Sequence, residues 1–139
     1  RKCKLKALNL RGCRSLEPQG GTRLFGSATA DVMRDIKELD MCSAKRLDTT
    51  VMADAIRMTT ALESLSLRYI ATSTIIEALA ESEAAKTSLR YLDVSFSDDL
   101  GDEACEALVN SAIHLERFNL RACRHVSAAL YNSIPVWLQ

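Results

Sequence analysis

Apolar residues recur along the chain in one fixed spacing that is repeated five times. The first copy reads L-x-x-L-x-L-x-x-C, with its key positions at Leu5, Leu8, Leu10 and Cys13. The later copies are Ile36, Leu39, Met41 and Ala44; Leu62, Leu65, Leu67 and Ile70; Leu89, Leu92, Val94 and Ser97; and Leu115, Phe118, Leu120 and Cys123. Their first residues are separated by 31, 26, 27 and 26 positions. A fixed period of ~20–50 residues predicts a solenoid of stacked units.

Each unit is predicted to be a strand followed by a helix. The L-x-L core alternates between inward apolar residues and outward ones, which is typical of a short strand with one buried face. Further along each unit the apolar spacing becomes helical, as in Val51, Met52, Ala55 and Ile56. Expected N-caps precede the helices at Asp48, Thr72, Asp102 and Ser127. The predicted fold is therefore an α/β solenoid of about five repeats, with parallel strands on the concave side and helices on the convex side.

The repeat resembles the leucine-rich repeat family, in the cysteine-containing subtype found in F-box-type substrate receptors. The fourth unit carries the likeness most fully, as "LRYLDVSFSDDLGDEACEAL" over residues 89–108. The family's cysteine position is kept only at Cys13 and Cys123, and no F-box motif is visible. The resemblance covers residues 1–139 as one repeat domain, and it implies a partner on the concave face. The chain starts at Arg1 without an initiator methionine, so we expect a fragment of a longer array.

The first unit is about five residues longer than the others, and the segment "EPQGG" at 17–21 accounts for the excess. Its proline and paired glycines are typical of turns and loops. We therefore predict a surface loop inserted between the first strand and its helix.

Polar residues at the third, fifth and seventh positions of each unit should project from the concave face. The candidate partner-binding residues are Arg11, Glu38, Asp40, Arg68, Tyr91, Asp93, Arg117 and Arg121. Parallel strands lie ~4.8 Å apart, so arginines on alternate strands would flank the aspartates between them. Two interpretations remain open: a partner-binding surface that uses Arg and Tyr anchors, or an Arg–Asp ladder that neutralises itself in solvent.

Two aromatic residues, Tyr69 and Phe96, occupy the eighth position of neighbouring units. They could form a small binding hot spot, or they could pack under the following loop as an extension of the core. Basic residues lie just beyond the strand ends at Arg14, Lys45, Arg46 and Arg124. An RNA or phosphate contact there is a minor possibility, because Lys plus Arg equals Asp plus Glu at 18 each and no aromatic platform is interleaved.

The sequence offers little chemistry beyond binding. The two histidines lie far apart in the sequence, and together with the five cysteines they form neither a nucleophile–base pattern nor a metal-ligand pattern. No catalytic residue, metal or cofactor is therefore predicted. An odd, scattered cysteine set is typical of reduced thiols, which favours an intracellular protein. No apolar run is long enough to cross a bilayer. Pro135 should end the last helix. Trp137 beyond it could cap the open edge of the stack, but we favour docking on another subunit or continuation of the repeat array.

The predicted function is a non-catalytic protein–protein interaction module that binds a protein partner through its concave strands. It could be the substrate-recognition domain of an F-box-like receptor. The alternative is a structural scaffold subunit of a large assembly, docked by its ends and helix side, with or without RNA contact. Neither a small-molecule substrate nor a membrane partner is expected.

Overall fold

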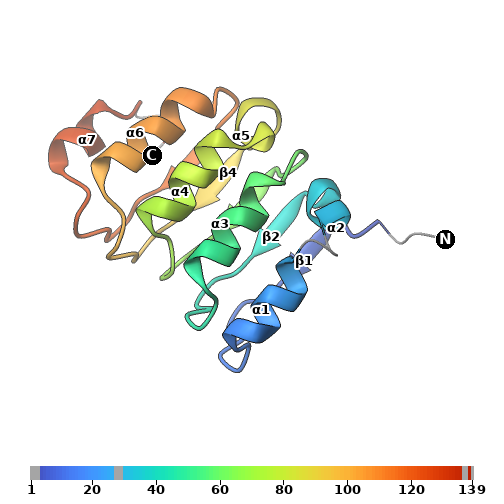
Figure 1. Ribbon diagram of the computed structural model, residues 1–139. Helices are drawn as coiled ribbons and strands as arrows, with labels where there is room; N and C mark the ends of the chain where they lie inside the picture. Colours follow the sequence, from blue (N-terminus) through green and yellow to red (C-terminus); the bar gives the residue numbers. More distant parts are fainter. Residues whose placement is uncertain (1–3, 27–29, 136–137, 139) are drawn as a thin grey trace.

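A five-stranded parallel sheet forms one side of the molecule in the computed structural model, which describes residues 4–26, 30–135 and 138. The strands are β1 (Ala7–Asn9), β2 (Glu38–Asp40), β3 (Ser64–Ser66), β4 (Tyr91–Asp93) and β5 (Arg117–Asn119). They follow one another in chain order across the sheet (Figure 1). Because each strand pairs with the strand of the next repeat, the predicted solenoid of five units is confirmed.

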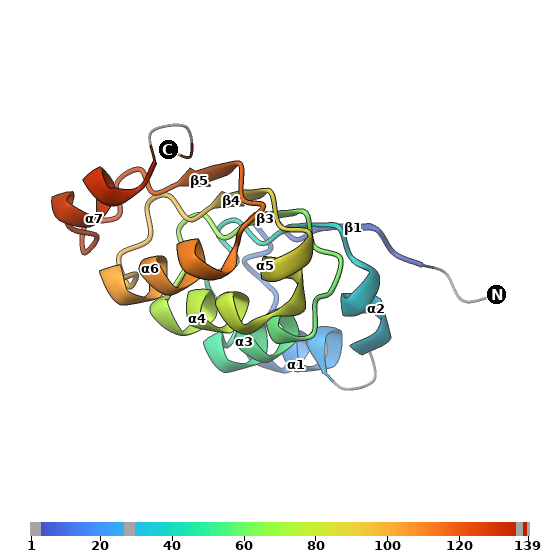
Figure 2. The ribbon, with the colours of Figure 1, turned by 90° about the horizontal axis from the view of Figure 1, so that it is seen from above.

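The helices lie together on the opposite side of the sheet, as Figure 2 shows for α1 to α6. They are α1 (Pro18–Phe25), α2 (Ala30–Asp35), α3 (Thr49–Arg57), α4 (Ser73–Glu81), α5 (Glu83–Thr87), α6 (Asp102–Ser111) and α7 (Ala128–Ser133). Helix α4 packs between α3 and α6. Its inner surface includes the buried Ala78, Leu79 and Ala80, whose small alanines let the neighbouring helices approach closely.

The core is a stack of equivalent side chains between the strands and the helices. Register pairs Leu8 with Leu39, Leu39 with Leu65, Leu65 with Leu92, and Leu92 with Phe118. This row is buried from Leu39 to Phe118, whereas Leu8 in the first unit is only partly buried. The periodic apolar residues of the sequence therefore form one continuous core along the stack.

Three of the four predicted N-caps are confirmed. The side chain of Asp48 accepts hydrogen bonds from the backbone N–H groups of Thr50 and Val51, and those of Thr72 and Ser127 each cap the helix that follows. The prediction for Asp102 is wrong, because Gly101 occupies the N-cap and Asp102 is the first residue of α6. Its carboxylate instead accepts from the backbone N–H of Ser127, at 2.8 Å, and so joins two successive units.

The inserted loop predicted at 17–21 is also wrong. Glu17 is the N-cap residue of α1, and the helix begins at Pro18. A proline suits this first helical position because its missing N–H would have no helical partner there. Gly21 then lies so near Leu47 that a Cβ would come within 2.8 Å of Leu47 Cδ2. The extra length of the first unit instead accompanies a second helix, α2.

Charge is distributed unevenly over the helices. Exposed glutamates lie along α4, α5 and α6 at Glu77, Glu81, Glu83, Glu103 and Glu106. One of them, Glu81, pairs with Arg57 of α3 at 3.0 Å. The convex side is therefore richer in carboxylates than the loops that follow the strands, which carry most of the basic residues described below.

Candidate functional site: the concave face and its basic edge

The outward residues of the five strands form an exposed polar surface on the concave side. Most of the predicted partner-binding residues lie on it: Arg11, Glu38, Tyr91, Arg117 and Arg121 are exposed, whereas Asp40, Arg68 and Asp93 are half-buried. Cys42 and Ser95, in the seventh-position row with the arginines, are buried. The structure therefore brings the predicted residues to one face, but it does not leave them equally accessible.

Fifth-position side chains close the turn at the end of their strands. Asn9 accepts a hydrogen bond from the backbone N–H of Arg11 at 2.9 Å, and Asn119 accepts one from Arg121 at 3.1 Å. Asp40 and Asp93 make the equivalent bonds two residues ahead in their units. This Asx turn satisfies a backbone donor where the strand stops. The Asn in the repeated "NLRGCR" and "NLRACR" segments is thus structural.

The Arg–Asp ladder is not formed in the described part of the chain. No ion pair joins Arg11, Arg68 or Arg121 to Asp40 or Asp93 there, since both carboxylates are turned to the backbone. The seventh-position arginines are therefore not neutralised by their neighbours on the sheet.

A different row carries the neutralised ladder, at the second position of the units, where the strands begin. Lys37 pairs with Glu63 at 2.8 Å, and Arg90 pairs with Glu116. The hydrogen bond and the charge of Lys37 lower the pKa of Glu63, and those of Glu63 raise the pKa of Lys37. The entry edge of the sheet is thus internally paired from the second unit to the fifth.

Tyr91 is tied to the same ladder. Its hydroxyl donates to a Glu116 carboxylate oxygen at 3.0 Å, and this bond, together with the carboxylate charge, raises the pKa of Tyr91. The ring stays 42% exposed, so Tyr91 offers a flat surface held in a fixed position.

The backbone turns left-handed at the eighth position of every unit. The φ angles are +71° at Gly12, +62° at Ser43, +70° at Tyr69, +60° at Phe96 and +57° at Ala122. A non-glycine residue in this region costs ~1–2 kcal/mol, and bulky residues are rare there. Two neighbouring units nevertheless carry an aromatic residue at this costly position.

Arg68, Tyr69 and Phe96 form one aromatic cluster at the exit end of β3 and β4. The two rings stack with centroids 5.1 Å apart and planes at 25°. The Arg68 guanidinium carbon lies 5.3 Å from the Tyr69 ring centre and 4.9 Å from that of Phe96. Tyr69 remains 42% exposed while Phe96 is half-buried. The two rings are thus neither fully buried in the core nor fully exposed to solvent.

Arg68 holds a buried donor without a partner. Its Nε atom is shielded from solvent and has no hydrogen-bond acceptor among the described residues. A buried donor that makes no hydrogen bond costs ~1–3 kcal/mol of stability, and more when the group is charged. The stacking of the guanidinium on the two rings offsets part of this cost.

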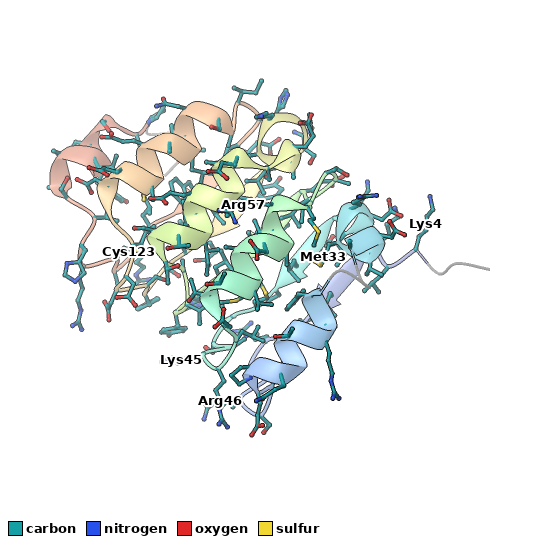
Figure 3. All side chains as sticks on the ribbon, viewed as in Figure 1. Lys4, Met33, Lys45, Arg46, Arg57 and Cys123 are labelled. Atoms are coloured by element: carbon teal, nitrogen blue, oxygen red, sulfur yellow. The ribbon has the colours of Figure 1, made fainter. Side chains whose placement is uncertain are left out.

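Beside the aromatic cluster lies a basic pocket, a hollow of about 670 Å³ lined by Arg14, Ser43, Lys45, Arg46 and Tyr69. Figure 3 shows Lys45 and Arg46 projecting from the loop that precedes α3. Lys45 Nζ lies 5.9 Å from the centre of the Tyr69 ring. Arg46 is 4.0 Å from Glu17, and neither Arg14 nor Lys45 pairs with a carboxylate within the described ranges. The predicted basic edge therefore becomes a defined concavity in the first three units.

The cysteines that the structure describes are free thiols that are fully or partly buried. Cys42, Cys105 and Cys123 are buried and Cys13 is half-buried. Burial raises the pKa of Cys105 to about 12, and it also raises that of Cys123, whose Sγ donates to the Val94 carbonyl at 3.2 Å. At the equivalent position, Ser97 accepts from the Ala71 N–H at 3.0 Å. In the fourth and fifth units, the ninth position is thus a polar bridge to the preceding unit.

The described residues hold no group of three or more His, Cys, Asp or Glu residues that could bind a metal ion. None of the helices in that part of the chain is long and apolar enough to cross a membrane. Trp137, the predicted end-docking residue, lies outside the described residues.

Three features of the site were missed by sequence reasoning. The Asx turns could have been predicted from the Asn or Asp that stands at the fifth position of four units, where the strand ends. The second-position ladder had one in the alternation of Lys37, Glu63, Arg90 and Glu116. The left-handed row was signalled only by Gly12, because its four other members are residues that seldom take this conformation.

Comparison with known proteins agrees with the geometry. The parallel strand–helix units define a solenoid repeat protein. A family model described as leucine-rich repeat matches residues 1–25 and 85–109. With five units in register, these matches identify the fold as a leucine-rich-repeat solenoid. The cysteine-containing, F-box-type subtype remains an expectation.

A solved structure supports the same fold. The crystal structure of the Rad7 and Elc1 complex in yeast contains a chain that matches with a TM-score of 0.68 and 18% identity. The match covers 88% of this chain and 29% of that one, so the present sequence spans less than a third of its neighbour's length. No curated protein matched.

Proposed function

We propose that this repeat domain binds a protein partner through the concave face and its exit edge, with no catalytic step of its own. The aromatic cluster is the observation that carries the proposal. Arg68, Tyr69 and Phe96 combine a costly backbone, a stacked and accessible ring pair and an unpaired buried donor. Such costs accumulate where a surface is used for binding. Arginine and tyrosine are also the residues most often found at the energetic centre of protein interfaces.

The surrounding residues extend this centre into a surface. Arg11, Arg117 and Arg121 are exposed cations without a carboxylate partner in the described part of the chain, and Tyr91 is a held aromatic on the same face. Glu38, Asp40 and Asp93 complete the set that we propose to contact the partner. The yeast neighbour was crystallised as a complex of Rad7 and Elc1, which agrees with protein binding as a role for this fold. A role as the substrate-recognition domain of an F-box-like receptor is a narrower form of the same proposal.

The test is capture of partners from the native source, followed by mass spectrometry. The immobilised protein is compared with the double variant Arg68→Glu and Arg121→Glu, and with Tyr69→Gly. The control reverses two charges on the helix side, Glu77→Lys and Glu106→Lys, both exposed in the structure. Circular dichroism and urea unfolding establish that each variant is folded.

We expect a specific partner to be lost from both concave-face variants and retained by the helix-side control. Retention of the partner by every folded concave-face variant would refute the proposal. If the helix-side control lost the partner at the same time, the result would favour the scaffold alternative, in which the helix side docks on an assembly.

A further inference from the structure

We propose that the basic pocket receives a phosphate monoester carried by the partner protein, such as a phosphoserine side chain. This inference rests on the proposed function, because the pocket adjoins the aromatic cluster through Tyr69, which belongs to both. It assigns the chemistry of one part of the interface.

The charge inside the pocket suits a compact dianion. Arg14, Lys45 and Arg46 reach the same hollow from two neighbouring units, and only Glu17 opposes them at ion-pair distance within the described residues. That contact, at 4.0 Å with both side chains more than half exposed, is a weak one. Two guanidinium groups and an ammonium can then donate charge-assisted hydrogen bonds to phosphate oxygens, and clusters of this kind recognise phosphorylated motifs.

Neighbouring residues supply the rest of the site. Ser43 lines the pocket, and its left-handed backbone is part of the turn. Arg68 is not a lining residue of the pocket, but its guanidinium carbon lies over the Tyr69 ring, 5.3 Å from the ring centre, and over the Phe96 ring. These contacts hold the ring that forms one wall of the pocket, so less conformational entropy is lost when a ligand binds.

A single anionic group fits this edge better than a long polyanion. Along the same row of loops, the fourth unit presents Asp98 and the exposed Asp99. Asp98 already pairs with Arg124 at 3.6 Å. A nucleic-acid backbone that followed the edge would meet these carboxylates, which repel phosphate.

The aromatic rings also favour a peptide over a nucleobase. The Tyr69 ring is stacked on Phe96, and both Arg68 and Lys45 lie near its ring centre. Single-stranded nucleic acid binds best to aromatic faces that are free for base stacking. A phosphorylated side chain can bind the exposed N–H groups of the cations without stacking on the ring. We therefore favour a phosphorylated protein segment.

The experiment follows backbone amide shifts by NMR while the protein is titrated with a short phosphoserine peptide flanked by glycines. The unphosphorylated peptide, inorganic phosphate and a short oligouridylate are titrated in parallel. The test variant neutralises Lys45→Gln and Arg46→Gln. Its matched control neutralises Arg23→Gln and Lys86→Gln, two exposed cations on the helices.

We expect the phosphopeptide to shift amides around Ser43, Lys45 and Tyr69, and to bind about tenfold more weakly to the pocket variant than to wild type or control. Binding should strengthen as the pH rises through ~6, where the phosphate becomes a dianion. Equal binding of the phosphorylated and unphosphorylated peptides, or no shift at the pocket, would overturn the inference. Tighter binding of the oligouridylate at these residues would overturn it in favour of nucleic acid.

Failure of this inference can be told apart from failure of the proposed function. A partner identified by capture is treated with a phosphatase and tested again. If it still binds wild type and still fails to bind Tyr69→Gly, the concave-face proposal stands and the phosphate site is refuted. If it no longer binds wild type, the phosphate site is supported.

Discussion

Replacing Tyr69 by glycine and, separately, by alanine tests whether the eighth position imposes its backbone on the side chain. Both variants remove the ring, so they lose the same stacking on Phe96. They differ in how they tolerate a φ of +70°. Alanine bears the left-handed cost of ~1–2 kcal/mol, which glycine avoids. The glycine variant, however, is less stable than the alanine variant by ~0.5–1 kcal/mol, because its unfolded chain has more conformational freedom.

The expected result is that Tyr69→Gly is about 0.75 kcal/mol more stable than Tyr69→Ala, from the difference between the midpoints of these two ranges. Urea unfolding measures it as a shift of the midpoint at unchanged slope. The sign is the informative part, because at an ordinary helical position glycine is the less stable residue by ~1 kcal/mol.

Glu77, exposed on α4, provides the matched control for this comparison. There, the glycine variant should be the less stable of the pair. Equal stability of the two Tyr69 variants, or a more stable alanine variant, would refute the idea that the turn dictates the conformation. The aromatic cluster would then not be held in a strained backbone conformation.

Three further predictions concern two contacts between units and one buried thiol. Ser97→Ala should destabilise the protein by ~0.5–1.5 kcal/mol in urea unfolding, because the N–H of Ala71 loses one of its two acceptors and keeps only the Leu67 carbonyl; an unchanged midpoint would contradict this. Alkylation of Cys105 at pH 8 should require unfolding, since its pKa of about 12 keeps the buried thiol neutral; rapid labelling of Cys105 itself in the native protein, located by mass spectrometry of its peptide, would be inconsistent with that. The hydrogen bonds from Ser127 lower the pKa of Asp102, so the stabilisation it gives should be present above the unfolded pKa of ~3.9 and lost as the pH falls through the lower folded value; Asp102→Ala should abolish this part of the pH dependence.

The sequence was sufficient to predict the architecture. Its signal was the recurrence of five apolar rows, and a buried row such as Leu39 to Phe118 can only be satisfied by stacking equivalent strands. N-caps were predictable where the capping residue had its own helix as the nearest partner. Asp102 escaped that rule because a backbone donor in the next unit, 25 residues along the chain, lies within reach of its carboxylate.

The candidate site was predictable only in outline. Alternation within the strands placed Arg68 and Tyr91 on the concave face, but it could not tell which rows would pair. Asp40 and Asp93 had a nearer partner in their own backbone than in the neighbouring arginines. The accessibility of Tyr69 depends on a left-handed turn that its residue type disfavours. Contacts of this kind follow from three-dimensional distances and leave little trace in spacing.

The uneven distribution of charge makes the molecule an electric dipole despite its formal net charge of zero. Glutamates such as Glu77 and Glu103 lie on the convex helices, whereas Arg14, Lys45 and Arg46 lie at the exit edge of the sheet. A zero total charge gives no net pull on a distant ion, but a dipole experiences a torque in the field of a charged surface. A negatively charged partner would therefore turn the domain so that its basic edge leads. At physiological ionic strength this alignment acts within ~8 Å, during the last step of an encounter.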